Sequence, residues 1–567
     1  MSRLIVLSNR VKMPDNNPMA GGLAIALHDL LRANSGIWMG WNGDIIDDHD
    51  DYLANDFSHS SQPVLTHSEQ EYDDKQPITT AVTYVTTPLT AQQYQHFYCG
   101  FANNVLWPLL HERHDLIRQA PQDYSGYQAV NQLFARQLKK IIQPDDVIWV
   151  HDYHFLSVAY HCRQLGMRNR IGFFLHIPFA PLAFWQPLAQ SAELIHHLAH
   201  YDVLGVQTYR DKANSSVVFA HYLKDYLISD DYRQEKGAID YQVINRLQDS
   251  RPQAATTPVN SAKTNRSAPL SLLLTLDSKS AVPHLLAINA YPIGVNVAKI
   301  QQQVSHLLSQ TPSHSSNPTQ KNDPIKSAAQ QIIAVDRIDY SKGLLSRFSA
   351  YRTFLQHYPN YQNQLQFLQI ACPSRLDLST YQQLHNEVRQ SICDINQQFS
   401  YPNTNAGTLH TTNCKMLNDI ASPIKTDDIF ENNKLIEPWQ AVTYSESALD
   451  HDILMSMFWQ SDVGWVNSLK DGMNLVAKEY IAAQNPDNPG VLLLSRYAGA
   501  AEQMQAAVLI DPLQPESIIH GLNTALTMPL AERKSRYQTL FQGLEQHNLH
   551  TWQQNFLKDL YPYSHKT

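Results

Sequence analysis

The sequence predicts an α/β protein made of two doubly wound domains, each built on a mostly parallel sheet. Three observations predict this fold. With 567 residues, the chain is too long for one ordinary hydrophobic core. Short apolar runs without alternating polar residues recur along it, as expected of strands that are buried on both faces. Amphipathic stretches separate these runs, which indicates helices that cross between parallel strands.

Nine apolar runs are interpreted as strands because each is short and rich in Val, Ile, Leu or Phe. These runs are residues 4–7, 147–150, 171–175, 203–207, 331–335, 365–371, 461–466, 491–495 and 507–510. Helices are expected at residues 22–32, 127–142 and 474–484, where apolar side chains recur at helical spacing.

Three stretches interrupt the alternation of strands and helices, at residues 247–283, 309–328 and 398–448. They are rich in Ser, Thr, Asn and Pro, a composition that buries little apolar surface, so we interpret them as surface insertions. The middle stretch lies near the join of the two halves. We therefore expect domains at residues 1–300 and 328–545.

Composition and charge exclude several classes of protein. The formal net charge of −9 argues against nucleic acid as the main partner, because duplex binding needs a basic face. No apolar run approaches the ~20 residues that a membrane span requires, and the run at 4–7 is too short for a signal peptide. The five cysteines show no paired spacing, which favours a reducing compartment, so we expect a cytoplasmic protein.

Charged and imidazole side chains gather where the predicted strands end. In open parallel sheets, ligands bind at the carboxyl ends of the strands. The main residues of this group are Arg10, His151, Asp152, His154, His176, Asp336, Arg337, Lys342, Arg375 and Asp471. Arginine clamps phosphate through two parallel hydrogen bonds and lysine acts as a point charge, so the pattern predicts an anion site. Alternatively, Arg337 pairs with Asp336 or Asp339, as surface arginines often do.

The stretch DGMNLVAKEY, residues 471–480, allows two interpretations. Asp471 could cap an ordinary helix that carries Lys478 and Glu479 on its solvent-facing side. In the other interpretation, Gly472 lets backbone approach a ligand closely, and the first-turn N–H groups face an anion. The polar strand ends elsewhere in the chain favour the anion site.

Other kinds of chemistry find little support in the sequence. His151 and His154 are three residues apart, a spacing that suits zinc ligands on a helix, whereas these residues follow a strand. Trp41 and Trp107 are equally compatible with a core and with the wall of a site. Neither the GxSxG motif of serine hydrolases nor the HExxH motif of zinc proteases occurs. We therefore expect no metal and no cofactor.

Nine motifs in order resemble the trehalose-6-phosphate synthases, a family of retaining glycosyltransferases with the GT-B fold. The motifs are SNR, AGGLA, NNVLWP, IWVHDYH, IGFFLHIPF, LGVQT, YPIGV, VDRIDYSKG and DGMNLVAKEY. The resemblance covers about residues 1–225, 285–395 and 449–560. It implies two Rossmann-like domains that face a central cleft, an N-terminal acceptor domain and a C-terminal nucleotide-sugar domain. It also implies that residues 546–567 form a helix that returns to the N-terminal domain.

The resemblance implies an acceptor site for glucose-6-phosphate in which cationic and phenolic groups hold the phosphate and polar groups orient the sugar. Its implied residues are Arg10, Trp41, Tyr98, Trp107, Asp152, Tyr153, Gln207 and Arg375.

The resemblance also implies a donor site for a nucleotide-glucose, with UDP-glucose as the expected donor. The implied donor residues are Gly21, Gly22, Arg337, Lys342, Leu449, Gly472, Met473, Asn474, Leu475, Val476 and Glu479, and the implied catalytic residues are Arg337, Lys342, Asp471 and His176. Arg337 and Lys342 would stabilise the departing diphosphate in place of a metal. Leu449 stands where the family usually has Phe beside the base.

The implied reaction is glucosyl transfer to glucose-6-phosphate with retention, which gives α,α-trehalose 6-phosphate. Two rival functions stay open at this point. One is a GT-B enzyme that uses another phosphorylated acceptor, such as glycerol-3-phosphate, and the other is an inactive sugar-phosphate sensor. A homo-oligomer is compatible with either.

Overall fold

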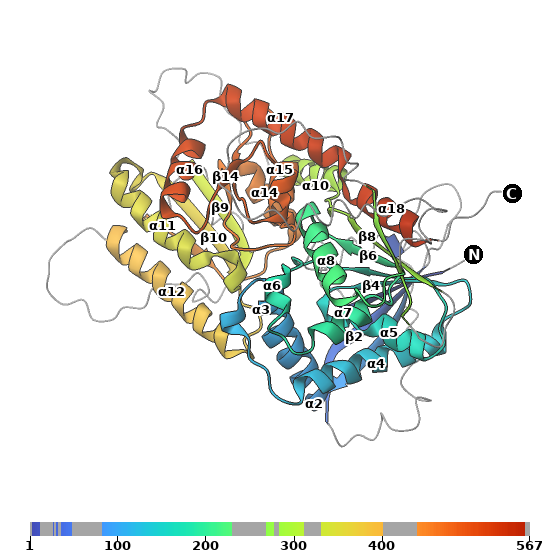
Figure 1. The fold of residues 1–567 in the computed structure, drawn as a ribbon. Coiled ribbons are helices and arrows are strands. Elements are labelled where there is room, and N and C mark those ends of the chain that lie inside the picture. The colour runs from blue at the N-terminus through green and yellow to red at the C-terminus, as the bar shows by residue number, and fades with distance from the viewer. Residues whose placement is uncertain are drawn as a thin grey trace. The chain divides into compact units, whose positions relative to one another are not determined.

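The computed structural model describes residues 3–11, 27, 30–31, 36–47, 82–228, 268–276, 283–310, 330–400 and 439–561. The chain forms two compact units (Figure 1). The first unit comprises Met1–Pro292 with Trp552–Thr567, and the second comprises Ile293–Thr551. The expected domain boundaries at 300 and 545 both fall inside helices of the second unit.

The first unit is built on an eight-stranded sheet of order β3-β2-β1-β4-β5-β6-β8-β7. All neighbouring strands are parallel except β7 and β8, which are antiparallel. The strands are β1 (Leu4–Arg10), β2 (Ile37–Ile46), β3 (Thr83–Thr90), β4 (Val147–His151), β5 (Ile171–Phe174), β6 (Val203–Val206), β7 (Leu270–Leu274) and β8 (His284–Ala290).

Strand β7 corrects the interpretation of residues 247–283 as an insertion. Leu272 and Leu274 are buried, and Leu270 is paired with Ile288 of β8. The run LSLLL therefore closes one edge of the sheet, although the polar residues before it concealed this strand in the sequence. The rest of 247–283, apart from 268–276 and 283, lies outside the described residues.

The helices of the first unit follow its strands, and a helix from the far end of the chain completes its core. They are α2 (Ala91–Gln93), the π-helix η2 (Tyr94–Leu106), α3 (Trp107–Leu110), η3 (His114–Leu116), α4 (Asp123–Ile141), η4 (Tyr153–Phe155), α5 (Val158–Gln164), α6 (Leu182–Trp185), α7 (Ser191–Leu198), α8 (Tyr209–Tyr222) and α18 (Leu549–Leu560). Phe556 of α18 stacks on Trp149 of β4, with ring centroids 4.5 Å apart. This close approach requires Gly172 and Gly205, where an added Cβ would lie 2.9 and 2.8 Å from the Phe556 ring.

The second unit is built on a six-stranded sheet in which every neighbouring pair is parallel, in the order β11-β10-β9-β12-β13-β14. Its strands are β9 (Gln330–Arg337), β10 (Leu365–Cys372), β11 (Thr443–Ser445), β12 (Val463–Val466), β13 (Val491–Ser495) and β14 (Val508–Ile510). Its helices are α10 (Val297–Gln310), η6 (Tyr340–Lys342), α11 (Leu344–His357), η7 (Pro359–Tyr361), α12 (Ser379–Phe399), α14 (His451–Gln460), α15 (Leu475–Ala482), η10 (Gly499–Glu502), α16 (Pro515–Thr527) and α17 (Leu530–Gln546).

The end of the expected insertion at 398–448 is also part of a core. Trp439, Ala441 and Val442 are buried in the second unit, and the Trp439 indole Nε1 donates to the Leu365 carbonyl oxygen at 2.9 Å. β11 then adds an edge strand to the sheet. Residues 439–445 are therefore structural, which corrects the insertion interpretation, and residues 401–438 lie outside the described part of the chain.

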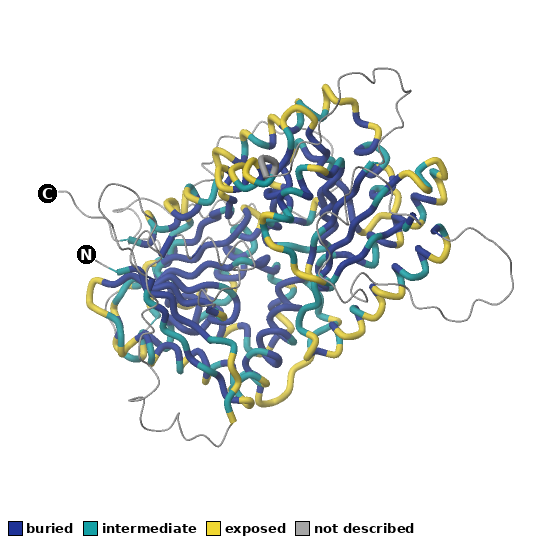
Figure 2. The backbone as a smooth tube through the Cα atoms, turned by 180° about the vertical axis from the view of Figure 1, so that it is seen from behind, coloured by how far each residue is buried: buried dark blue, intermediate teal, exposed yellow. Residues whose placement is uncertain are grey.

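All nine predicted strands are confirmed, and the strands of both sheets are largely buried (Figure 2). Predicted helices at 127–142 and 474–484 are confirmed as α4 and α15. In the predicted helix 22–32, only residues 27, 30 and 31 are described, and they are helical. Among the described residues, no helix is both long and apolar enough to span a membrane.

Candidate active site

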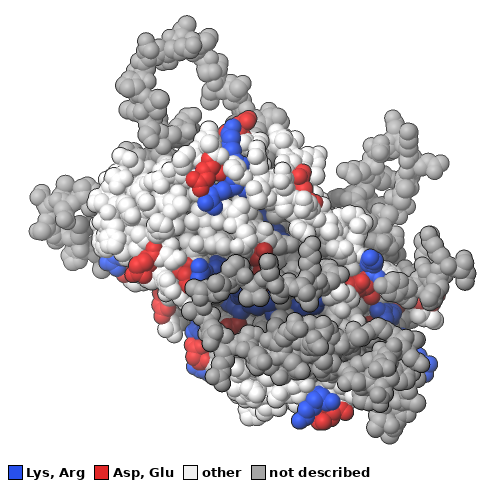
Figure 3. Space-filling model, turned by 45° about the horizontal axis from the view of Figure 1, so that its top comes forward, with Lys and Arg blue, Asp and Glu red and all other residues white. Residues whose placement is uncertain are grey.

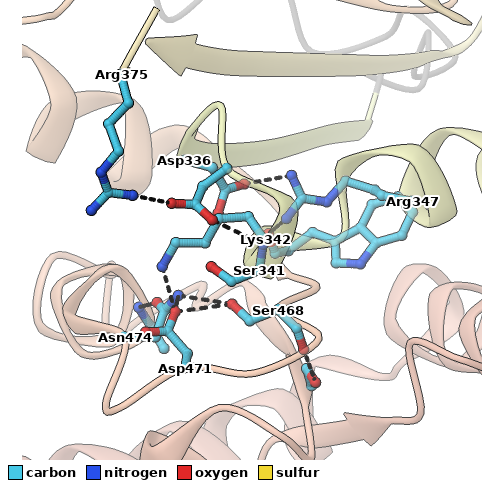
Figure 4. Close-up of polar contacts among 12 residues, drawn as sticks. Asp336, Ser341, Lys342, Arg347, Arg375, Ser468, Asp471 and Asn474 are labelled. Atoms are coloured by element: carbon cyan, nitrogen blue, oxygen red, sulfur yellow. Dashed lines mark hydrogen bonds and ion pairs between the residues drawn. The ribbon is translucent and has the colours of Figure 1, made fainter. Parts of the chain in front are cut away.

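The carboxyl ends of the second unit's strands carry a cluster around Asp471 (Figure 4). The Lys342 ammonium lies 2.5 Å from the Asp471 Oδ2. The Ser468 hydroxyl and the Asn474 side-chain amide each donate to the same oxygen at 3.0 Å. Three donors therefore fix one carboxylate. Lys342 reaches it because Gly343 adopts a left-handed conformation, φ 63°, where the loop turns into α11.

The start of α15 differs from the expectation that Asp471 caps it. Asn474 is the cap, with φ 75°, and its side-chain oxygen accepts from the Ala477 N–H at 3.1 Å. Gly472 and Met473 lie in the loop before the cap, and Leu475 begins the helix. The Asp471 carboxylate thus belongs to the Lys342 cluster, and Asn474 serves both the helix and the cluster.

Lys478 and Glu479 are buried, so the interpretation that places them on a solvent-facing side is wrong. The Lys478 ammonium donates to the Ile293 carbonyl oxygen at 2.6 Å and to the Gln503 side-chain oxygen at 2.7 Å. Burial lowers the pKa of Lys478 to about 7. The Glu479 carboxylate lies 3.8 Å from Nε2 of His451, the first residue of α14. The partly exposed Leu449 precedes that helix.

Each of the two carboxylates that the sequence interpretation offered to Arg337 pairs with another arginine. Asp336 pairs with Arg347 at 2.5 Å, and Asp339 pairs with Arg375 at 2.9 Å. Arg375 is also hydrogen-bonded to the Tyr381 hydroxyl at 2.7 Å. Arg337 itself is exposed at the end of β9. Sequence reasoning missed Arg347, because nothing in an amphipathic helix marks an arginine whose partners lie on strands.

The first unit carries a different group at the ends of β1 and β2. Arg10 is exposed, and its guanidinium carbon lies 5.6 Å from the centre of the Trp41 ring. The guanidinium lies over Gly43, where an added Cβ would be 2.6 Å from Nη2. The Trp41 ring contacts Tyr94 and Tyr98 of η2, with centroids 5.6 and 5.7 Å apart. Aromatic packing thus sets the position of the cation.

Imidazole groups follow β4 and β5 in the same unit. The His151 Nδ1 and the His176 Nε2 lie 2.9 Å apart, so one ring donates to the other. Burial lowers the pKa of His176 to about 3 and that of His151 well below its usual value, so both rings are neutral at pH 7. Asp152 adopts φ 70°, and its carboxylate accepts a hydrogen bond from the backbone N–H of His176 at 3.2 Å.

Of the remaining predicted residues of the first unit, Trp107, Tyr153 and Gln207 are buried and Tyr98 is partly buried. The Tyr153 hydroxyl donates to the Asn103 side-chain oxygen at 2.8 Å. Trp107 packs on the Tyr153 ring at 5.5 Å, and the Tyr98 ring stacks on His154 at 5.9 Å. Gln207 is buried directly after β6. Asn103 lies in the NNVLWP motif, but its role was not predicted, because it depends on a tyrosine 50 positions away.

Two further site expectations concern glycines and metal. Gly21 and Gly22 lie outside the described residues. Within the described ranges, no group of three or more His, Cys, Asp or Glu side chains has an arrangement that could hold a metal ion. On the described surface in Figure 3, basic side chains mostly lie in small groups together with acidic ones.

Three comparisons relate the chain to known proteins. The sequence profile of glycosyltransferase family 20 matches residues 7–427 and 426–562. A trehalose-6-phosphate synthase of Sodalis glossinidius (strain morsitans) is 34% identical over 561 residues, which cover 99% of this chain and 96% of that protein.

Solved structures agree with the sequence relatives. An alpha,alpha-trehalose-phosphate synthase (UDP-forming) from Burkholderia xenovorans, in complex with glucose-6-phosphate, superposes with a TM-score of 0.73 at 32% identity, covering 99% of this chain and 100% of that one. An E. coli structure bound with UDP-2-fluoro glucose gives a TM-score of 0.71 at 30% identity, covering 99% of both chains.

Proposed function

The chain belongs to glycosyltransferase family 20, and from that premise we propose that it transfers glucose from UDP-glucose to glucose-6-phosphate, forming α,α-trehalose 6-phosphate. The observation that carries the proposal is the Lys342–Asp471 pair beside the start of α15. This pair puts a cation for phosphate and a carboxylate for sugar hydroxyls side by side, as a sugar diphosphate requires. Relatives over the full chain are UDP-forming synthases, and one was solved with glucose-6-phosphate.

The second unit supplies the donor site in this proposal. Arg337 and Lys342 hold the diphosphate, and Asp471 binds a hydroxyl of the donor glucose. Backbone N–H groups between Gly472 and Val476 approach the diphosphate, where the positive end of the α15 dipole favours an anion. Glu479 holds the ribose hydroxyls, and the backbone at Leu449 meets the base. The buried position of Glu479 supports its role, because a buried carboxylate suits a fixed contact better than a solvated one.

The first unit supplies the proposed acceptor residues other than Arg375. Arg10, Tyr98 and Tyr153 bind the phosphate of glucose-6-phosphate, whereas Asp152, Trp41 and Gln207 orient the sugar and Trp107 shapes the wall. Arg10 suits a phosphate, because its exposed guanidinium is held by a ring and not by a carboxylate in the described contacts.

The proposed role of Arg375 in phosphate binding depends on the residues that surround its guanidinium. Its guanidinium is shared with Asp339 and Tyr381, so in the proposal it contributes to phosphate binding only as part of this group.

Catalysis in this proposal is electrostatic. The bond between the anomeric carbon of the donor and the diphosphate oxygen breaks, and the acceptor hydroxyl attacks that carbon from the same face. The acceptor proton passes to the leaving phosphate oxygen, while Arg337 and Lys342 stabilise the charge that develops on the diphosphate. His176 contacts the donor sugar as a neutral hydrogen-bonding group, since burial lowers its pKa to about 3.

The test is product identification with two donors and two acceptors. Purified protein is incubated with UDP-glucose or GDP-glucose and with glucose-6-phosphate or glycerol-3-phosphate. We expect UDP and a disaccharide phosphate with two α-anomeric protons only when glucose-6-phosphate is present. Transfer to glycerol-3-phosphate alone would assign a different acceptor, and binding without turnover would indicate a sensor.

We also propose that the reaction takes place in the cytoplasm and that the protein forms a homo-oligomer. The four cysteines in the described residues, Cys99, Cys162, Cys372 and Cys393, are free thiols, which supports a reducing compartment. Light scattering of the purified protein would measure its oligomeric state.

A further inference from the structure

Arg347 is a buried cation that the proposed reaction does not use. It lies on α11, with no exposed surface, and its Nη1 donates to the Asp336 Oδ2 at 2.5 Å and to the Gln369 Oε1 at 2.7 Å. Its Nη2 lies 3.4 Å from the Trp465 carbonyl oxygen. Burying a guanidinium is costly, and removing one partner of a buried pair leaves an uncompensated charge.

The partners of Arg347 lie on three adjacent strands of the second sheet. Asp336 is the next-to-last residue of β9. Gln369 belongs to β10 and Trp465 to β12, the two strands that flank β9. The orientation of Gln369 is fixed, because its amide donates to the Ala334 and Ile370 carbonyl oxygens at 3.3 and 3.1 Å. One guanidinium therefore ties together the carboxyl ends of the strands from which the donor loop emerges.

Asp336 lies within electrostatic reach of the proposed donor site. Burial raises the pKa of its carboxyl group, whereas the charges of Arg347 and Lys342 lower it and the charge of Asp471 raises it. Arg337 follows Asp336 directly in the chain, and Lys342 lies six residues after Asp336, at the end of η6. Among these groups, Lys342 is the second cation whose charge acts on the Asp336 carboxyl group.

We propose that Arg347 is a positioning residue for the donor diphosphate, because its guanidinium neutralises Asp336 and so keeps the Lys342 ammonium at Asp471 and the ligand. The inference rests on the proposed function of the second unit as the donor site. It assigns to Arg347 no contact with substrate. A purely structural role, in which the pair only holds strand ends together, predicts a loss of stability without a specific loss of donor binding.

The experiment uses the full-length protein and a charge-balance series: Arg347→Met, Arg347→Lys, Asp336→Asn and the double variant Asp336→Asn/Arg347→Met. Calorimetry measures the Kd for UDP, and steady-state kinetics measure the donor and acceptor constants separately. Arg163→Met is the control, because Arg163 pairs with Asp202 at 2.9 Å in the first unit, although that pair is less deeply buried than Arg347 and Asp336.

We expect Arg347→Met to raise the Kd for UDP by about tenfold or more. This is the size of coupling that is typical between residues of one charge network. The double variant should restore the Kd for UDP to within about twofold of wild type, since neither charge remains. Arg347→Lys should bind UDP better than Arg347→Met, and Asp336→Asn should bind UDP no more weakly than wild type. The acceptor KM should stay constant in the series, and Arg163→Met should leave UDP binding unchanged.

Two results would overturn the inference: normal UDP binding by Arg347→Met, or a double variant as weak as the single one. If Arg347→Met does not fold, the double variant and Asp336→Asn test the inference instead. Weak UDP binding by either variant would contradict the proposed role of Arg347. In a Lys342→Ala background, Arg347→Met should add little further loss. A wild-type protein that neither binds UDP nor forms product would refute the proposed function itself, whereas an active wild type with an insensitive series refutes only the role of Arg347.

Discussion

The two units hold their candidate site residues in different ways at the carboxyl ends of their strands. In the first unit the candidate residues are rings and neutral imidazoles, and Arg10 rests on Trp41. In the second unit the cations Lys342, Arg347 and Arg375 already pair with carboxylates. A substitution in the first unit therefore removes one contact, whereas a substitution in the second also leaves an opposite charge without its partner.

Among these substitutions, Lys342→Ala in the second unit should reduce activity the most. It removes a cation from the developing charge of the diphosphate, so kcat should fall by about 10²- to 10³-fold, and donor affinity should fall as well. Steady-state kinetics with varied UDP-glucose measure both. The control is Lys299→Ala, which removes an exposed lysine of α10. An unchanged kcat in Lys342→Ala would mean that this lysine only holds Asp471 in place.

Arg10→Ala should have a smaller and more selective effect in the first unit. It should raise the apparent KM for glucose-6-phosphate by an amount equivalent to about 1.5–3 kcal/mol, because one charged phosphate contact is lost. The donor constants should stay near those of wild type. The exposed Arg136 of α4 offers a control, Arg136→Ala. Loss of donor binding in Arg10→Ala, with normal glucose-6-phosphate saturation, would refute the division of roles between the units.

Low pH should next destabilise the first unit, because several of its histidines are buried or half-buried. Burial lowers the pKa of His161 and His200 to about 4 and that of His197 to about 3, from a usual value of 6.5. Their contribution is intact above pH 6.5. Between pH 6.5 and about 3–4 the unfolded state binds protons that the folded state does not. Each histidine therefore lowers the free energy of unfolding by up to about 1.4 kcal/mol per pH unit, and the partly exposed His161 by less.

Denaturant unfolding at pH 7.5 and 5.5 measures this acid dependence. We expect lower stability at the lower pH, and His197→Gln should reduce the difference because one titrating group is removed. Equal stability of the wild type at both values of pH would contradict the assignment of neutral, buried rings.

Chelation should have the smallest effect. If the cations of the second unit replace a metal ion, excess EDTA should leave turnover unchanged, and added Mg²⁺ should not raise it. The assay uses the same substrates as the product test, with a magnesium-dependent coupling enzyme left out. Loss of nearly all activity with EDTA, restored by Mg²⁺, would show that the clamp of Arg337 and Lys342 is insufficient.

The sequence was most informative where local pattern and structure coincide. The buried strands and the polar residues that follow them are encoded within a few positions of each other, so β9 with Arg337 and Lys342 could be predicted. Five of the described strands were not predicted: β2, β3, β7, β8 and β11. β3 contains threonines and a proline, β7 follows a polar stretch, and β11 is only three residues long. Their stability comes from neighbouring strands, which a single segment does not reveal.

The sequence by itself determined the two parallel sheets, the family and the positions where charged groups leave the strands. Only the tertiary structure decided which charges are partners. It buries Lys478 against the Ile293 carbonyl 185 positions away, gives the helix cap to Asn474, and pairs Asp336 with Arg347 across the sheet edge. The physical reason is that apolar burial follows local periodicity, whereas the free energy of a buried charge depends on its few nearest partners, wherever the chain brings them from.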